Sequence, residues 1–341
     1  KIKSVYSLFM TATEKNFDNS DEIYTMSNKN IFGEIIDNKS IKWAIDNKKI
    51  TDYRIICLQN NESEINDIMN KIGFKAIVKE NKFKDIKSFD KKQLFISAFS
   101  ALKLISEKKS SHTLIYTNNC ISSDLIEIII DKILENGYFK SIDIDNFYNS
   151  SLTSKSNVDL EKEIKKFTNF KYGIIPCVYI FGEGVDIPKL DTVVIAEKMT
   201  TEIRIVQSCL RPNRLYDDNP DKIAKIVIPK LSSNIDDKLK MVVSHMANED
   251  ETIEQKIEFI KIKPTKSKVT DKTFDKYVLL ERNNEILNTI KLDLYKSNCF
   301  GRELTLQKEY ELYHNSVLEK KFNCIKDYLD SDMEHKNPNV Y

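Results

Sequence analysis

Helical and strand-like hydrophobic patterns alternate along the middle of the chain. Phe95, Phe99 and Leu102 recur at the spacing of one helix face, and the apolar run 113–116 that follows predicts a buried strand. The alternation continues to Pro229, with helices expected over 121–133, 160–167 and 202–210 and strands over 141–148, 173–180, 191–196 and 223–228. This order is typical of a parallel sheet with helices on both faces. We therefore expect a three-layer α/β domain, in which Pro176 ends or bends its strand.

The sequence on either side of this region predicts a different organisation. Upstream, strands are expected at 5–10 and 53–58, Trp43 is expected to pack within a helical segment, and 59–90 is expected to be a weakly helical insertion. After Lys230 the alternation stops. The sequence there becomes polar and mostly helical, and its clearest apolar stripe is Tyr310, Val317, Leu318, Phe322 and Ile325. We expect the acidic run 248–251 to be a solvated loop. The chain is thus divided into 1–50, a domain at 51–230 and a helical accessory region at 231–341.

Composition and charge exclude several classes of protein. The 341 residues are 41% hydrophobic and 31% charged, which excludes disorder along the whole chain and is enough for about two domains. A net charge of +1 argues against binding nucleic acid by bulk electrostatics. The six cysteines form no C-x-x-C pair and the four histidines show no metal spacing, so we expect neither a metal site nor disulfides. Without a long apolar run or a leader, the protein is expected to be soluble and intracellular, with no membrane partner.

Arginine is scarce and clustered. Of six arginines, three lie within eleven positions, at Arg204, Arg211 and Arg214. Gln207 and Arg211 are i and i+4 neighbours on the predicted helix, and Pro212 is expected to end that helix and re-aim Arg214. Two guanidinium groups and an amide that converge suit a phosphate. An ordinary helix end with arginines favoured by the helix dipole explains the same residues equally well.

Three further segments carry polar or glycine residues next to predicted strands. Residues 181–188, Phe-Gly-Glu-Gly-Val-Asp-Ile-Pro, offer two glycines and the acceptor Asp186, although a plain tight turn explains the glycines as well. Thr11-Ala12-Thr13 and the segment 116–119 follow apolar strands. Ligands of open α/β sheets bind at the carboxyl ends of strands. Each segment alone is a weak signal, because such residues are common in loops.

In chain order, these segments resemble the motifs of superfamily 2 helicases. Thr11-Ala12-Thr13 is similar to motif III, 114–119 to motif IV, 182–188 to motif V and 207–214 to motif VI. The segment 46–54 is similar to the linker between the two RecA-like domains of DEAD/DEAH-type members related to restriction-enzyme motors. The composition rich in asparagine, lysine and isoleucine resembles helicases of large DNA viruses, which would act in the host cytoplasm or the virion.

The resemblance implies a RecA-like fold and a role for each motif. Arg214 would act as an arginine finger on the γ-phosphate of ATP, with Arg211 and Gln207 as its partners. The residues expected to contact the nucleotide are Gly182, Glu183, Gly184 and Asp186. Those expected to couple hydrolysis to movement are Thr11, Ala12 and Thr13. Those expected to contact nucleic acid, DNA in preference to RNA, are Thr117, Asn118, Asn119, Ser151 and Thr153.

Two departures from the family pattern shape the expectation. The glycine usual before the first motif VI arginine is Leu210 here, and no Walker A lysine or DEAD/DEAH carboxylate is present. We therefore expect the chain to be the C-terminal half of a longer helicase, inactive alone, whose Mg²⁺ ligands lie in an upstream RecA-like domain. A non-catalytic RecA-like scaffold or nucleic-acid-binding module, and a double-strand translocase that does not unwind, are the alternatives.

Overall fold

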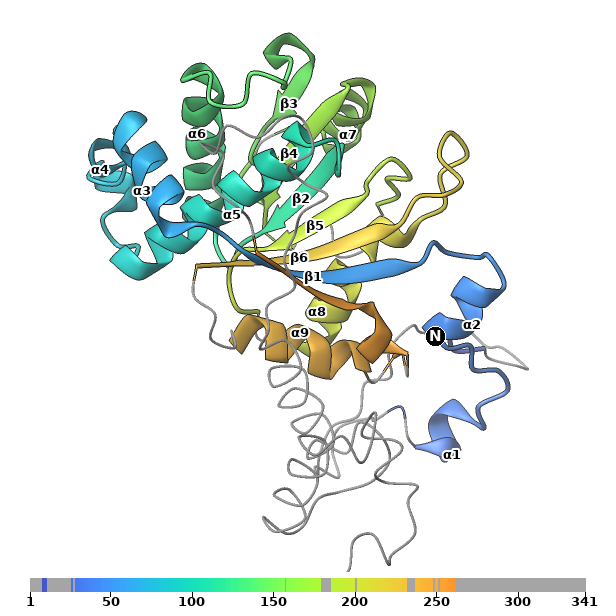
Figure 1. Ribbon diagram of the computed structural model, residues 1–341. Helices are drawn as coiled ribbons and strands as arrows, with labels where there is room; N and C mark the ends of the chain where they lie inside the picture. The colour runs from blue at the N-terminus through green and yellow to red at the C-terminus, as the bar shows by residue number, and fades with distance from the viewer. Residues whose placement is uncertain are drawn as a thin grey trace, which may run out of the picture.

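A parallel sheet forms the centre of the chain (Figure 1). The computed structural model describes residues 8–10, 26, 28–156, 158–178, 185–199, 201–231, 237–247, 249–250 and 252–261. Within them seven strands pair in the order β3-β4-β2-β5-β6-β1-β7, every pair parallel. The strands are β1 (Tyr53–Gln59), β2 (His112–Tyr116), β3 (Phe147–Asn149), β4 (Tyr172–Cys177), β5 (Thr192–Ile195), β6 (Ala224–Lys230) and β7 (Ile257–Lys261).

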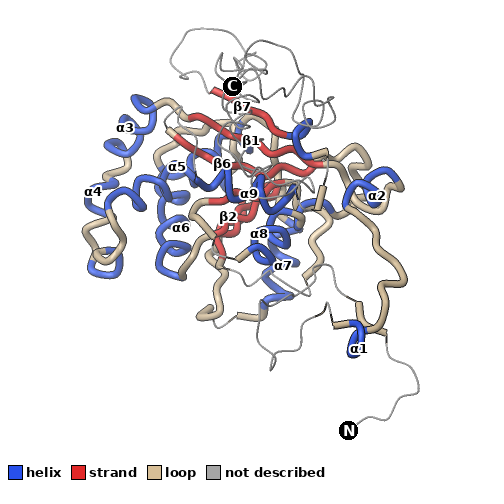
Figure 2. The backbone as a smooth tube through the Cα atoms, turned by 90° about the horizontal axis from the view of Figure 1, so that it is seen from below, coloured by secondary structure: helices blue, strands red, loops and turns tan. Residues whose placement is uncertain are grey.

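Helices cover both faces of the sheet (Figure 2). One face carries α3 (Glu62–Lys71), α4 (Phe74–Ile77), η1 (Asn81–Phe83), α5 (Ser88–Ser106) and α6 (Cys120–Glu135). The other carries α7 (Leu160–Asn169), α8 (Glu202–Cys209) and α9 (Asp237–Ala247). The remaining helical elements are α1 (Lys29–Phe32), α2 (Ile41–Asp46), η2 (Ile144–Asn146), η4 (Arg211–Asn213) and η5 (Ile253–Lys256). The expected three-layer α/β architecture is confirmed.

Alternation along each strand separates two hydrophobic cores. On β1, Tyr53, Ile55 and Cys57 face the core shared with α8 and α9, whereas Ile56 and Leu58 face α5. Side chains of a strand point to opposite faces, so a strand buried on both faces is apolar throughout. The continuous apolar runs in the sequence have this cause.

Most of the expected elements are present, with shifts at their ends. The strand expected at 141–148 is mostly wrong, because η2 occupies 144–146 and β3 spans only 147–149. β4 ends one residue after Pro176, as expected near a proline in a ladder. Of the strand expected at 5–10, only 8–10 are described, and they have no regular structure.

The sheet continues past Lys230, contrary to the expected change to a helical region. α9 packs on the sheet, and β7 adds a parallel strand along the outer edge of β1. β7 has only five residues, Ile-Glu-Phe-Ile-Lys, and follows the short 3₁₀ helix η5. The sequence contains no long apolar run there that would predict a strand. The expected stripe from Tyr310 to Ile325 lies outside the described residues.

Trp43 does not pack in the core as expected. α2 turns Ile41 and Ile45, which are i and i+4 neighbours, toward the core below the sheet. Trp43, two residues from each, therefore points the other way and is 39% exposed. Lys39 lies over its ring, 5.0 Å from the centroid.

Candidate functional site

The segment 207–214 passes from an α-helix through a 3₁₀ helix to extended backbone. α8 ends at Cys209, η4 follows over 211–213, and Arg214 has extended backbone. Leu210, which caps α8, has φ −87° and packs against the core. Only positive φ favours glycine strongly, so leucine fits this position without backbone strain.

Residues Val185 and Asp186 hold the two arginines. Arg211 Nη1 donates to the backbone oxygen of Val185 at 2.6 Å. Arg214 Nε lies 3.3 Å from Asp186 Oδ1, and the side chains of this ion pair are 52% and 70% exposed. One arginine is thus partly buried and anchored to the backbone, and the other stands in solvent beside a carboxylate. The structure brings together the described part of the motif V segment and the motif VI segment.

Asn213 ties this segment to the start of the sheet. Its side-chain amide donates to the backbone oxygen of Thr51 at 2.9 Å, and its own backbone oxygen accepts from the Thr51 N–H at 2.8 Å. Asn213 is buried. It lies between two arginines in the sequence and precedes Arg214 directly, so it fixes the backbone from which Arg214 projects. Sequence reasoning missed Asn213, because its partner lies 162 residues away.

The candidate residues lie at opposite ends of the parallel strands. Thr51 precedes β1, and Asn213 bonds to it, so Arg214 lies at the amino ends of the central strands. Thr117 follows β2, and its N–H donates to the oxygen of Cys177 at the end of β4, which places it at the carboxyl ends. The structure therefore separates the arginines from the motif IV segment.

Among the expected nucleic-acid residues, three are buried and hydrogen-bonded inside the protein. Thr117 Oγ1 donates to the oxygens of Asn119 and Cys177. Ser151 Oγ donates to Asp124 Oδ1 at 2.9 Å, and the Thr153 N–H donates to Ser156 Oγ at 2.9 Å. These contacts shape the loops after β2 and β3. Their side chains are not on the surface.

The other two, Asn118 and Asn119, are exposed at the same edge. Asn119 Oδ1 accepts from the Ser122 N–H at 2.8 Å and caps α6, as asparagine commonly does. The Asn118 N–H donates to Glu197 Oε2 and its side chain to the oxygen of Lys198, both across to the loop after β5. Burial raises the pKa of Glu197.

Two exposed lysines at this edge were not anticipated. Lys198 follows β5 and Lys155 follows the loop of Ser151 and Thr153, and both are exposed. In a chain with 53 basic residues, no single lysine stands out in the sequence. Only the topology shows that these two share an edge with Asn118.

Most of the remaining expected residues lie outside the described part of the chain. Gly182, Glu183 and Gly184 lie outside the described residues, as do Thr11, Ala12 and Thr13. Gln207 is half-buried in the last turn of α8, four residues before Arg211. Because α8 ends at Cys209, Gln207 and Arg211 do not share one continuous helix.

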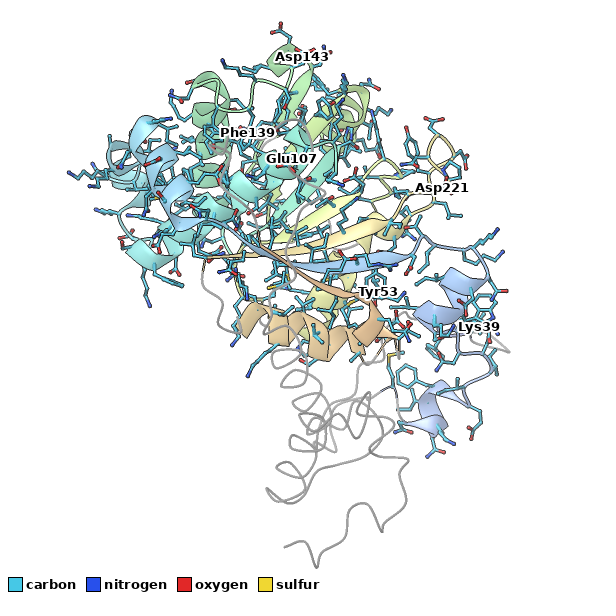
Figure 3. All side chains as sticks on the ribbon, in the orientation of Figure 1. Lys39, Tyr53, Glu107, Phe139, Asp143 and Asp221 are labelled. Carbon is cyan, nitrogen blue, oxygen red and sulfur yellow. The ribbon has the colours of Figure 1, made fainter. Side chains whose placement is uncertain are left out.

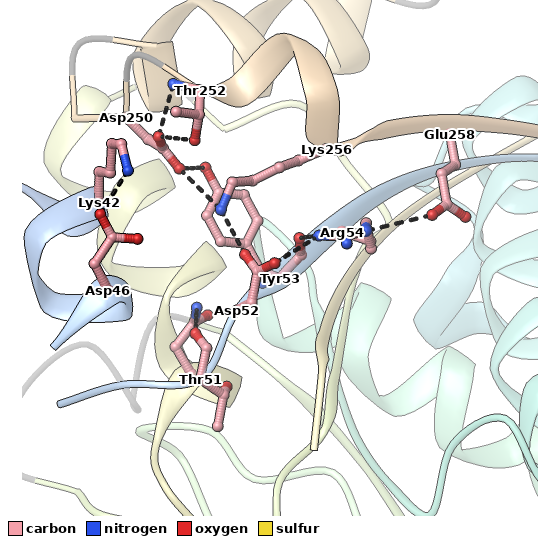
Figure 4. Close-up of polar contacts among 11 residues, drawn as sticks. Lys42, Asp46, Thr51, Asp52, Tyr53, Arg54, Asp250, Thr252, Lys256 and Glu258 are labelled. Atoms are coloured by element: carbon pink, nitrogen blue, oxygen red, sulfur yellow. Dashed lines mark hydrogen bonds and ion pairs between the residues drawn. The ribbon is translucent and has the colours of Figure 1, made fainter. Parts of the chain in front are cut away.

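A buried polar cluster joins the start of β1 to the segment before β7 (Figure 4). The hydroxyl of Tyr53 donates to Asp250 Oδ2 at 2.8 Å. The Lys256 ammonium pairs with Asp52 and Asp250 and lies 4.5 Å from the centroid of the Tyr53 ring. Figure 3 labels Tyr53 at the start of β1 and Asp221 in the loop before β6. The interpretation of 248–251 as a solvated loop is wrong for Asp250, which is 1% exposed.

The charges of this cluster shift its pKa values. Burial acts to raise the pKa of Asp52 and of Asp250, but hydrogen bonds outweigh it and lower both. Those bonds come from Lys256 and Arg54 to Asp52, and from Thr252 and Tyr53 to Asp250. Burial and the neighbouring Asp250 raise the pKa of Tyr53. Both carboxylates are therefore ionised at neutral pH.

Among the described residues, no three histidine, cysteine, aspartate or glutamate side chains gather so as to hold a metal ion. Nor is any described helix long and apolar enough to cross a membrane. His112 is buried, and its Nε2 lies 3.1 Å from the oxygen of Phe167. Burial lowers the pKa of His112 to about 4.

Comparisons with known proteins bear on the fold. Residues 90–215 match the model of the helicase conserved C-terminal domain. The ATP-dependent type ISP restriction-modification enzyme LlaBIII bound to DNA superposes with a TM-score of 0.54 and 13% identity, over 91% of this chain and 22% of that chain. A fragment of a type I restriction enzyme HsdR subunit from Vibrio vulnificus YJ016 gives 0.46 and 15%, over 69% and 41%. No curated protein matches the sequence. The chain spans less than half of either solved protein.

The fold and the arginine segment define a RecA-like α/β domain. Residues 90–215, from α5 through Arg214, form a helicase C-terminal domain within it.

Proposed function

We propose that the chain is the C-terminal RecA-like half of an ATP-dependent nucleic-acid helicase or translocase of superfamily 2. In the whole enzyme, Arg214 is the arginine finger that completes an ATPase site formed with an upstream RecA-like domain. The proposal rests on the helicase C-terminal domain at 90–215 and on the place of Arg214 within it.

One observation carries the proposal. Arg214 stands half-exposed at the surface, while Arg211 and Asn213 on either side of Pro212 are fixed by hydrogen bonds to the protein. A guanidinium that projects from a rigid segment is suited to a phosphate presented by a second domain.

The chemistry is attack of water on the γ-phosphorus of ATP, with departure of ADP. Negative charge spreads over the γ-phosphate oxygens in the transition state, and Arg214 stabilises that charge. Arg211, bonded to Val185, holds the two segments together. Asp186 becomes available to a ribose hydroxyl when Arg214 turns to the phosphate. Gln207, Gly182, Glu183 and Gly184 complete the nucleotide side in this proposal.

The described arginines fit a triphosphate, and Mg²⁺ would offset part of its charge when bound. Its ligands are expected in the upstream domain. The ATP-dependent, DNA-bound state named for LlaBIII supports ATP as the substrate and DNA as the partner.

The carboxyl edge of the sheet is the proposed contact surface for nucleic acid. Asn118 and Asn119 are its exposed amides, and Lys155 and Lys198 its exposed cations. Thr117, Ser151 and Thr153 shape the loops that present them. Thr11, Ala12 and Thr13 would couple hydrolysis to movement along the strand. A viral origin remains part of the proposal on the sequence resemblance alone.

The test uses the chain joined to its proposed upstream domain. We expect ATP hydrolysis that single-stranded DNA stimulates, and weaker stimulation by Asn118→Ala and Lys198→Ala together. Displacement of a strand from a duplex, beside displacement of a triplex-forming strand, separates unwinding from translocation on double strands. Hydrolysis that neither DNA nor RNA stimulates would overturn the nucleic-acid part of the proposal.

A further inference from the structure

The loop 214–223, which runs from Arg214 to the start of β6, is exposed over most of its length. In Figure 1 it extends away from the sheet. Backbone turns close it internally, from the Asn219 N–H to the oxygen of Tyr216 at 2.9 Å and from the Lys222 N–H to the oxygen of Asn219 at 3.1 Å. Lys222 differs from the rest of the loop, because only 5% of it is exposed. Its side chain therefore anchors a loop that otherwise stands in solvent.

The Lys222 ammonium contacts the stretch that carries Asp186. Its Nζ donates to the backbone oxygens of Pro188 at 2.6 Å and of Leu190 at 3.0 Å. The Leu190 N–H in turn donates to the oxygen of Ile187 at 3.0 Å, so the two acceptors belong to a closed turn. A buried ammonium is costly unless its donors are used, and these backbone oxygens use two of its three donors. The side chain thus joins the loop to this turn.

Arg211 makes a similar contact on the other side of Arg214. Its Nη1 donates to the backbone oxygen of Val185 at 2.6 Å, so donors that flank Arg214 in the sequence both bind the stretch 185–190. The ion pair of Arg214 with Asp186 is different, because both of its side chains are more than half exposed. Exposed ion pairs are weak. Arg214 can therefore leave Asp186 for a phosphate while the two flanking contacts stay in place.

We propose that Lys222 is a positioning residue for Arg214, because its ammonium fixes the loop after Arg214 against the stretch that carries Asp186. The inference rests on the proposed function. When Arg214 turns from Asp186 to the γ-phosphate, Arg211 holds the residues before it and Lys222 holds the residues after it. Transition-state stabilisation depends on this placement, since a displacement of about 1 Å can cost about 100-fold in rate.

The charge of Lys222 adds a pH dependence that can be measured. Burial lowers the pKa of Lys222 to about 8. Four charged groups have smaller effects, Asp191 and Asp186 raising the pKa and Lys225 and Arg214 lowering it. As the pH rises through the pKa, Lys222 loses its charge and one of its three donors. A neutral donor makes a weaker hydrogen bond than a charged one, so the contacts to Pro188 and Leu190 weaken.

The test compares ATP hydrolysis by Lys222→Met, Lys222→Arg and Lys225→Met in the whole enzyme, with single-stranded DNA present. Methionine keeps much of the length of lysine but has no donor, so kcat should fall about tenfold or more while KM for ATP changes little. Arginine keeps the charge and the donors and should recover most of the rate. Lys225, whose Nζ donates to the nearby oxygen of Ile223 at 3.2 Å, is the matched control and should keep the wild-type kcat.

A pH series gives a second readout that needs no methionine variant. Between about pH 7 and pH 9, the wild-type kcat should fall as Lys222 loses its proton, whereas the kcat of Lys222→Arg should fall less, because arginine stays protonated. A side chain that only stabilised the fold would not transfer its own titration to kcat.

The outcomes separate this inference from the function on which it rests. A wild-type enzyme that hydrolyses no ATP would overturn both. If Arg214→Lys lowers kcat but a folded Lys222→Met turns over as fast as Lys225→Met, the inference alone fails. Thermal melting shows whether Lys222→Met is folded at the assay temperature. If it is not, the pH series decides, and an equal alkaline fall of kcat in wild type and in Lys222→Arg would overturn the inference.

Discussion

Replacing Lys256 by methionine removes the only charge that faces both Asp52 and Asp250 in the cluster of Figure 4. Methionine keeps much of the length and apolar volume of lysine, so the cavity left behind is small. Asp250, whose side chain is 0% exposed, would keep its negative charge with no cation beside it. Removing one partner of a buried ion pair destabilises a protein by about 3–5 kcal/mol.

Several contacts that remain place the expected loss at the lower end of that range. Asp250 still accepts from the Tyr53 hydroxyl and from the N–H and hydroxyl of Thr252. Asp52 is partly exposed and keeps Arg54 as its partner at 2.9 Å. We therefore expect Lys256→Met to lower the free energy of unfolding by about 3 kcal/mol. For a domain of this size, about 2–4 °C are lost per kcal/mol, so Tm should fall by roughly 6–12 °C.

The assay is thermal and urea unfolding of the full chain, with Lys92→Met as the matched control. Lys92 pairs with Glu62 at 2.9 Å, but these side chains are 32% and 65% exposed. An exposed pair contributes about 0–1 kcal/mol, so the control should barely move. In a background of Asp250→Asn, Lys256→Met should cost clearly less, because no buried carboxylate is left unpaired. Equal losses for Lys256→Met and Lys92→Met would refute the reasoning.

Low pH should reduce the contribution of the same cluster. The folded-state pKa values of Asp52 and Asp250 lie below the ordinary value of 3.8. Their stabilisation is therefore fully present above about pH 3.8 and is lost as the pH falls through the lower folded-state values. The difference in stability between wild type and Lys256→Met should shrink in that acidic range.

Two further predictions concern His112 and Asn213. His112 has a folded-state pKa of about 4 against an ordinary value of 6.5, so only the unfolded chain takes up its proton between those values. Stability should thus fall by about 3 kcal/mol as the pH drops from 6.5 to 4, and His112→Gln should flatten this part of a pH series of urea midpoints; an identical slope would contradict it. Asn213→Ala removes the side-chain bond to Thr51 and should lower the kcat of the whole enzyme about tenfold or more while KM for ATP changes little, as for a residue that positions Arg214. Asn219→Ala, on an exposed turn of the same loop, is the control, and equal kcat values for the two variants would refute this role.

Periodicity predicted the helices well because each pairs one apolar face with one side of the sheet. α6 was expected over 121–133 and spans 120–135, and α8 was expected over 202–210 and spans 202–209. β3 was misplaced and β7 was not predicted, because the three residues of β3 and the Ile-Glu-Phe-Ile-Lys of β7 lack the continuous apolar runs that marked β2 and β5. Burial of such short strands depends on neighbours far away in the sequence.

The candidate site was predictable where residue type alone signals chemistry. Scarce arginines drew attention to Arg211 and Arg214, and the structure places both beside Val185 and Asp186. Contacts between residues far apart in the sequence could not be predicted from it. Asp250 was expected in solvent, yet its partner Tyr53 lies 197 residues away. Local charge patterns cannot show such a contact, because burial is a property of the folded sheet.

The most direct test of the central claim is ATP hydrolysis by the chain joined to its proposed upstream domain, with Arg214 or lysine at that position. Lysine keeps the charge but loses the planar fork that can contact two oxygens at once. Arg204→Lys, at an exposed position of α8, is the matched control. At saturating ATP and single-stranded DNA, Arg214→Lys should lower kcat by about 10³-fold or more, the scale of an arginine finger. A turnover rate for Arg214→Lys equal to that of Arg204→Lys would contradict the assignment of Arg214 as the residue that stabilises the transition state.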